Sequence, residues 1–129
     1  MFQNYDPQDM TARLLAMIGE PYEQDGCIKF VRRALWEFGV QIEGTKAGAL
    51  RDRRLFSKVE FGSLGTIIVW QGLQGQFIGQ EFHVGIMLDR RWALQSSWGT
   101  FGVGRIEITR HPWVDSQRGF YRPKALLCT

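Results

Sequence analysis

The sequence predicts an α+β fold in which N-terminal helices pack on an antiparallel sheet of about five strands. Two amphipathic helical patterns occupy the first forty residues, and from Thr66 onward the spacing of apolar residues becomes that of strands. Helices followed by a run of strands are typical of α+β proteins, whereas a parallel sheet needs the two to alternate. The 129 residues, 44% of them hydrophobic, are expected to form a single domain spanning 1–129.

Both helices carry recognisable start and stop signals. The first is expected to follow Asp6 as N-cap, with Pro7 in its first turn and Gly19 as its stop. The second is expected to run from Cys27 to Gly39, with Asp25 as its cap. Apolar stripes at helical spacing support both helices; they comprise Met10, Leu14, Met17 and Ile18 in the first, and Ile28, Val31, Leu35 and Phe38 in the second.

The strands are predicted from β-branched and alternating segments. They are expected at 66–71, 81–88, 92–97, 105–109 and 120–127. The glycine-bearing segments 72–80 and 98–104 are expected to be loops. Residues 47–56 are expected to be a short helix or irregular, and whether the segment 41–65 covers a cleft stays open.

Composition and charge narrow the possible partners. Sixteen basic and thirteen acidic residues are mixed along the chain, and the densest basic stretch, "RDRR", itself contains an acid. This pattern is typical of a solvated face and does not indicate nucleic-acid binding. Two distant cysteines make no disulfide framework, and the paired close spacings of a zinc finger are absent, so a zinc site of that kind is not expected. No signal peptide or membrane-length apolar run is present, so we expect a chain made in the cytoplasm without membrane insertion.

Cys27 is a candidate nucleophile because it lies where the second helix begins. The partial positive charge of a helix N-terminus lowers the pKa of a thiol and favours the reactive thiolate. Cys27 also shares the apolar stripe of Val31 and Leu35, which is expected to face the sheet. The alternative is that Cys27 is simply a small core residue.

His83 is the candidate base. It alternates with Val84 on the strand "EFHVGIML", and Gly85 leaves room for another group to approach the ring. The alternative is a partly exposed histidine on a solvent face. His111, in a loop before a proline, is a poorer candidate.

A residue of the next strand is expected to orient His83. A three-residue turn at Leu88–Arg90 pairs Met87 with Arg91 and places Gln95 opposite His83, where its amide oxygen accepts a hydrogen bond from the ring. A two-residue turn presents Ser96 instead, and Ser97 is the remaining candidate.

Three segments carry a family resemblance: "LLAMIGEPYEQDGCIKFVRRALWEFGV", "FGSLGTIIVWQ" and "FHVGIMLDRRWALQSSWG". Together they resemble the NlpC-type cysteine peptidases, papain-like enzymes that cut peptidoglycan stem peptides. The last is similar to the family's "HVGI" motif. The resemblance covers roughly residues 14–122 and implies a papain-like fold, with an Asp-Cys-type helix start packed on the sheet.

The resemblance implies a thiol protease site and its substrate. It makes Cys27 the nucleophile, His83 the general base and Gln95 the third polar residue, with Tyr22 lining the substrate site near the oxyanion. It implies hydrolysis of stem-peptide amides through an acyl-enzyme, without metal or cofactor.

Some features depart from the family pattern and support alternatives. Gly26 stands where the family has Asp, Ile28 stands where it has Ser, and "GSLG" replaces its "PGD" turn. These differences favour a rival hypothesis, a structural plug or adaptor of a phage tail tip that has lost catalysis. A related amidase effector is a third possibility.

Unsignalled, stand-alone domains of this kind resemble phage tail-tip modules. The resemblance therefore suggests a virion component that meets tail-tip or hub proteins and degrades the cell wall. The five tryptophans are expected either to pack in the core and rim or to line a glycan groove.

Overall fold

The computed structural model describes residues 6–23, 26–42, 53–71, 81–97, 102–108 and 117–128. Its elements, in chain order, are α1 (Pro7–Leu15), α2 (Gly26–Glu37), β1 (Phe56–Val59), β2 (Ile67–Gln71), β3 (Glu81–Met87), β4 (Trp92–Ser97), β5 (Gly102–Glu107), β6 (Gln117–Pro123) and the 3-10 helix η4 (Lys124–Cys128). The strands form an antiparallel six-stranded sheet in the order β1-β6-β2-β3-β4-β5. The predicted α+β class is confirmed.

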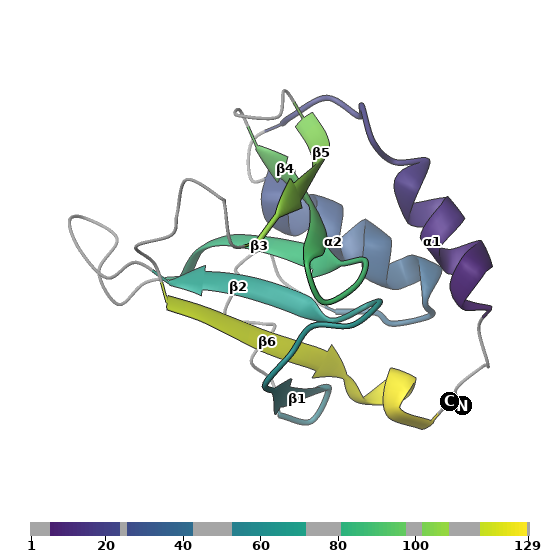
Figure 1. Ribbon diagram of the computed structural model, residues 1–129, viewed down its shortest axis with the longest axis vertical. Helices are drawn as coiled ribbons and strands as arrows, with labels where there is room; N and C mark the ends of the chain where they lie inside the picture. The colour runs from purple at the N-terminus through teal and green to yellow at the C-terminus, as the bar shows by residue number, and fades with distance from the viewer. Residues whose placement is uncertain are drawn as a thin grey trace.

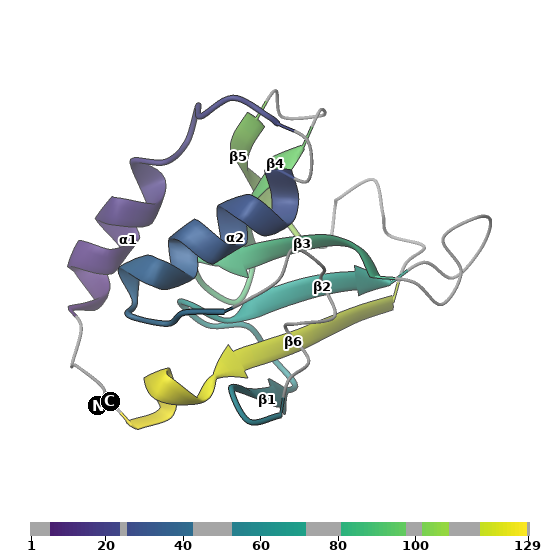
Figure 2. The ribbon, with the colours of Figure 1, turned by 180° about the vertical axis from the view of Figure 1, so that it is seen from behind.

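The helices lie on one side of this sheet. Figures 1 and 2 show α2 lying across one face of the sheet, with α1 flanking α2. An ion pair between Arg13 of α1 and Glu37 of α2, 3.2 Å long, joins the two helices. β4 and β5 cross the direction of β2 and β6 steeply in Figure 1, so the sheet is strongly twisted. Among the described helices, none has the length and apolar character needed to span a membrane.

Both helices begin as their sequences predict, but α1 ends early. Asp6 caps α1 by accepting a hydrogen bond from the backbone N–H of Gln8 at 2.9 Å, and Pro7 is its first residue. α1 ends at Leu15, and Gly19 takes the left-handed φ of +96° three residues after the C-cap. Asp25, the expected cap of α2, lies outside the described residues.

The observed strands differ from the predicted ones at β1, β5 and β6. β1 was not predicted; only one of its four residues is buried, so it carries no clear alternating signal. β5 begins at Gly102, inside the segment expected to be a loop, because backbone pairing with β4 extends through two glycines. The last strand ends at Pro123, which lacks a backbone N–H, and the chain continues as η4 rather than as strand. Residues 43–52, most of the uncertain excursion, lie outside the described residues.

The sheet has an apolar core on each face. Alternate residues of β2 and β3, such as Val69 and Val84, pack beneath α2 with Phe30 and Leu35. The intervening residues form a second cluster on the opposite face, which includes Ile68, Trp70, Met87, Ala93 and Ile108. Trp70, the cross-strand partner of His83, belongs to this second cluster.

The segment before α2 is held to the edge strand β5. The N–H of Gly19 donates to the Val103 carbonyl at 2.9 Å, and the N–H of Val103 donates to the Glu20 carbonyl at 2.8 Å. The Glu20 carboxylate also pairs with Arg33 of α2. Gly102 has a φ of +121°, and a Cβ there would overlap the Glu20 carbonyl oxygen. A glycine at position 102 therefore permits the close approach that fixes the start of α2.

We expect Gly102→Ala to destabilise the protein by more than about 3 kcal/mol, because it adds a backbone clash to an unfavourable φ. Gly19→Ala is the matched control: its φ is also left-handed but nothing lies within 4 Å, so it should cost only about 1 kcal/mol. Urea unfolding of both variants measures the difference. Equal losses of stability would show that the contact with Glu20 contributes nothing.

Candidate active site

Cys27 is the second residue of α2 and is half-buried. Its side chain packs against the apolar cluster beneath the helix. Its backbone N–H is among the first four of the helix, which have no intrahelical acceptor. The thiol is thus in the partial positive field of the helix N-terminus while its side chain also contributes to packing. This position fits both predictions made for Cys27, a nucleophile at a helix start and a small core residue.

His83 lies on β3 and is buried, with 5% of its surface exposed. It pairs across the strands with Trp70 of β2, and the two ring centroids lie 5.2 Å apart. A solvent-face histidine is therefore ruled out. A buried imidazole must have its polar nitrogens hydrogen-bonded, because an unsatisfied ring nitrogen costs free energy.

Gln95 of β4 supplies that hydrogen bond. His83 Nε2 lies 2.7 Å from Gln95 Oε1, and Gln95 is fully buried. Because the amide oxygen only accepts hydrogen bonds, Nε2 carries the hydrogen. In the neutral ring this leaves Nδ1 as the nitrogen that can accept a proton. The hydrogen bond to Gln95 thus leaves His83 with an unprotonated nitrogen, Nδ1, which a general base requires.

The predicted register between β3 and β4 is wrong, although the contact between His83 and Gln95 is present. Met87 pairs with Ala93 rather than with Arg91. The Asp89 side chain accepts from the N–H groups of Arg91 and Trp92 at 2.8 Å each, which closes the turn later than expected. A shift of two residues keeps Gln95 on the same face of the sheet.

Gly85 makes the diagonal contact possible. In the observed register Gln95 lies beside Gly85, and a Cβ on Gly85 would lie 3.4 Å from the Gln95 Cβ and 2.8 Å from the Leu94 carbonyl oxygen. With no side chain at position 85, Gln95 extends over the backbone of β3 towards His83. Diagonal neighbours on antiparallel strands are within reach of long side chains.

Ser96 connects this pair with the start of α2. It points to the other face of β4, and its hydroxyl lies 3.4 Å from the position that a Cβ on Gly26 would take. The Tyr22 ring lies 3.3 Å from the same position. Figure 2 shows the first turn of α2 beside β4. The residue before Cys27 and the residue after Gln95 are therefore neighbours, whereas the direct approach of Cys27 to His83 stays a prediction.

Two contacts were missed by the sequence analysis. Trp70 was considered only as packing or a glycan-groove residue, yet it lies against His83; the alternation of β2 could have placed it on that face. Ser96 was considered as a partner of His83. Because side chains alternate along β4, Ser96 points to the opposite face from Gln95 and lies near Gly26 instead. His111 lies outside the described residues, and within the described part of the chain no group of three His, Cys, Asp or Glu residues could hold a metal ion.

Comparison with known proteins identifies the fold. No family model matches the sequence, and no curated protein matches it. The structure is similar to the NlpC/p60 domain of the peptidoglycan hydrolase SagA, with a TM-score of 0.64 and 20% identity over 89% of this chain and 97% of that one.

Two further solved structures are similar. One is an NlpC/p60 family protein from Bacillus cereus ATCC 10987, with a TM-score of 0.69 and 18% identity over 95% of this chain. The other is a protein described as similar to lipoprotein, of the NLP/P60 family, from Staphylococcus aureus subsp. aureus Mu50, with a TM-score of 0.70 and 16% identity over 94% of this chain. The chain covers only 40% and 43% of these two proteins. At these identities the likeness establishes a shared fold.

We expect the neutral ring of His83 to carry its hydrogen on Nε2, which long-range 15N–1H NMR reports directly. The protein has two histidines, so a His83→Ala spectrum assigns the signal. Gln95→Ala should remove the tautomer preference and cost about 1–3 kcal/mol of stability, because it leaves a buried N–H unpaired. A wild-type ring with its hydrogen on Nδ1 would contradict this geometry.

Proposed function

We propose, on the premise of its NlpC/p60 fold, that this protein is a peptidoglycan hydrolase that cleaves stem-peptide amide bonds with Cys27 as nucleophile. The observation that carries the proposal is the buried hydrogen bond between His83 and Gln95, on strands adjoining the start of α2. A solved structure of the same fold is a domain of a peptidoglycan hydrolase, which supports the substrate class. The fold alone does not fix an activity, so the proposal depends on the residues of the site.

In the proposed mechanism, His83 first activates the thiol. Nδ1 of His83 takes the proton of Cys27, and the resulting thiolate attacks the carbonyl carbon of the scissile amide. The C–S bond forms as the carbonyl π electrons move to oxygen. The backbone N–H of Cys27 at the helix start is suited to donate to this oxyanion, and Tyr22 lines the same site.

The intermediate then collapses and is hydrolysed. The C–N bond breaks while His83 Nδ1 returns its proton to the leaving amine, which gives an acyl-enzyme on Cys27. Nδ1 next takes a proton from water as the water attacks the thioester carbonyl. The C–S bond then breaks, the carboxylic acid product leaves, and Nδ1 returns the proton to the Cys27 sulfur. Throughout, Gln95 Oε1 accepts from Nε2–H, so that the basic nitrogen keeps its orientation.

Association with a phage tail tip or hub, where the virion delivers the enzyme to the cell wall, is a separate part of the proposal. It extends the expectation, drawn from the sequence, that stand-alone domains of this kind occur in phage tail tips. The rival, a structural module without catalysis, differs in one observable property, which is the dependence of wall digestion on Cys27.

Cys27→Ala should abolish the release of peptides from purified peptidoglycan, because the proposed acyl-enzyme forms on the Cys27 sulfur. The release of new amine and carboxylate groups measures the activity. Mass spectrometry of the products identifies the cleaved bond. Cys128→Ser is the matched control, since it removes the other cysteine and should retain full activity.

The variants must be shown to be folded by circular dichroism and thermal unfolding. Equal digestion by wild type and Cys27→Ala would overturn the cysteine mechanism. Absence of digestion by wild type under all conditions would favour the structural module.

A further inference from the structure

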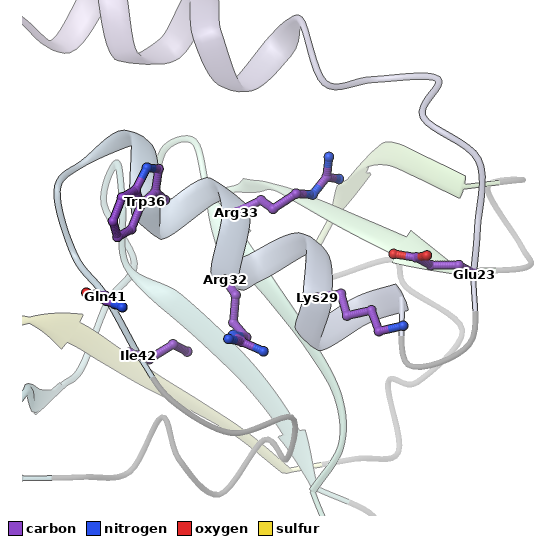
Figure 3. Close-up of a pocket in the computed structure, with 7 residues that line it drawn as sticks. All are labelled: Glu23, Lys29, Arg32, Arg33, Trp36, Gln41 and Ile42. Atoms are coloured by element: carbon purple, nitrogen blue, oxygen red, sulfur yellow. The ribbon is translucent and has the colours of Figure 1, made fainter.

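A second feature of α2 lies outside the proposed catalytic residues. It is a groove of about 480 Å³ along the helix, lined by Glu23, Lys29, Arg32, Arg33, Trp36, Gln41 and Ile42. Figure 3 shows Lys29 and Arg32 projecting from α2, with Gln41 and Ile42 on the segment after the helix and Glu23 on the segment before it. We call it the α2 groove.

The α2 groove carries a surplus of positive charge. Three of its lining residues are cations and one is a carboxylate. Arg33 pairs with Glu20. Among the described residues, Lys29 and Arg32 form no ion pair, although several other arginines of the structure are paired. Within the described part of the chain, no carboxylate neutralises these two cations.

An exposed aromatic side chain also lines the groove. Trp36 is 62% exposed, although Trp70 is fully buried. Trp98 and Trp113 lie outside the described residues. A large exposed aromatic side chain beside cations is typical of a binding surface, because it offers apolar contact area at little entropic cost.

The position of the groove relates it to the proposed active site. Lys29 is two residues after Cys27 on α2, and Trp36 is seven residues further along. At about 1.5 Å per residue, the groove extends roughly 10 Å along the helix away from the thiol. Because successive residues turn by about 100° around the helix, the groove side chains lie on the side of α2 opposite Cys27, and a polymer held at the helix start reaches them by passing around its first turn.

We propose that the α2 groove binds free carboxylates of peptidoglycan next to the stem peptide that is being cleaved. The inference rests on the proposed function, because peptidoglycan is the anionic polymer that function brings to Cys27. Lys29 and Arg32 bind the carboxylates, and Trp36 packs against the apolar face of the same polymer. Glu23 opposes carboxylate binding at the end of the groove nearest Tyr22.

The binding test uses a Cys27→Ala background, so that no substrate is consumed. Purified sacculi freed of teichoic acid are the probe, and cosedimentation at about 0.15 M salt gives the apparent Kd. Lys29→Gln/Arg32→Gln should weaken binding roughly tenfold, as expected for the loss of charge-assisted contacts. Trp36→Ala should also weaken binding, whereas Glu23→Gln should strengthen it.

The matched control is Arg53→Gln/Lys58→Gln, which removes the same two charges from exposed positions outside the groove. Its binding should change less than twofold. Sacculi whose carboxylates have been converted to methylamides should bind wild type and groove variants equally weakly. Equal binding by the groove and control variants would overturn the proposal, as would a need for teichoic acid.

A second readout separates this inference from the proposed function. With Cys27 present, the groove variant should hydrolyse a single soluble stem peptide as wild type does but digest intact sacculi several-fold more slowly. Loss of both activities would contradict a role confined to polymer binding. If wild type hydrolyses neither substrate while binding still depends on Lys29 and Arg32, the catalytic proposal fails and the groove proposal stands.

Discussion

The hydrogen bond between His83 and Gln95 is the interaction on which the candidate site depends. It is 2.7 Å long and buried, beside Trp70. In such a poorly solvated place an imidazole without a partner would be costly, so the two side chains fix each other's position. The bond needs a specific backbone as well. A side chain on Gly85 would contact the Leu94 carbonyl oxygen and the Gln95 side chain.

The half of the candidate site that contains Cys27 and Tyr22 is held by a different set of contacts. Backbone hydrogen bonds tie Gly19 and Glu20 to Val103, and the Glu20 carboxylate reaches Arg33 on α2. These contacts hold the short segment that carries Tyr22 against the helix start. The sheet and the helix are thus joined by both packing and hydrogen bonds. A nucleophile and a base on separate elements need this rigidity, since small displacements greatly reduce reaction rates.

The sequence predicted the elements that carry strong periodic patterns and missed those defined by pairing. α2 and β3 were predicted because their apolar spacing is regular, whereas β1 exists through its pairing with β6 and has little pattern of its own. The contact of Gln95 with His83 was predicted from a wrong register. The contact is present because a register error of two residues leaves Gln95 on the same face of the sheet as His83. The position of the turn depends on the Asp89 side chain, which strand periodicity does not report.

The most direct test of the account is the pH dependence of Cys27 alkylation by iodoacetamide in a Cys128→Ser background. Assembly of the thiol with the base predicts an apparent pKa well below the free-thiol value of about 8.5. It also predicts that His83→Ala, shown to be folded, moves the pKa back towards that value. A slow thiol with a pKa near 8.5 that is unaffected by His83→Ala would contradict the account, because Cys27 and His83 would then not form one site.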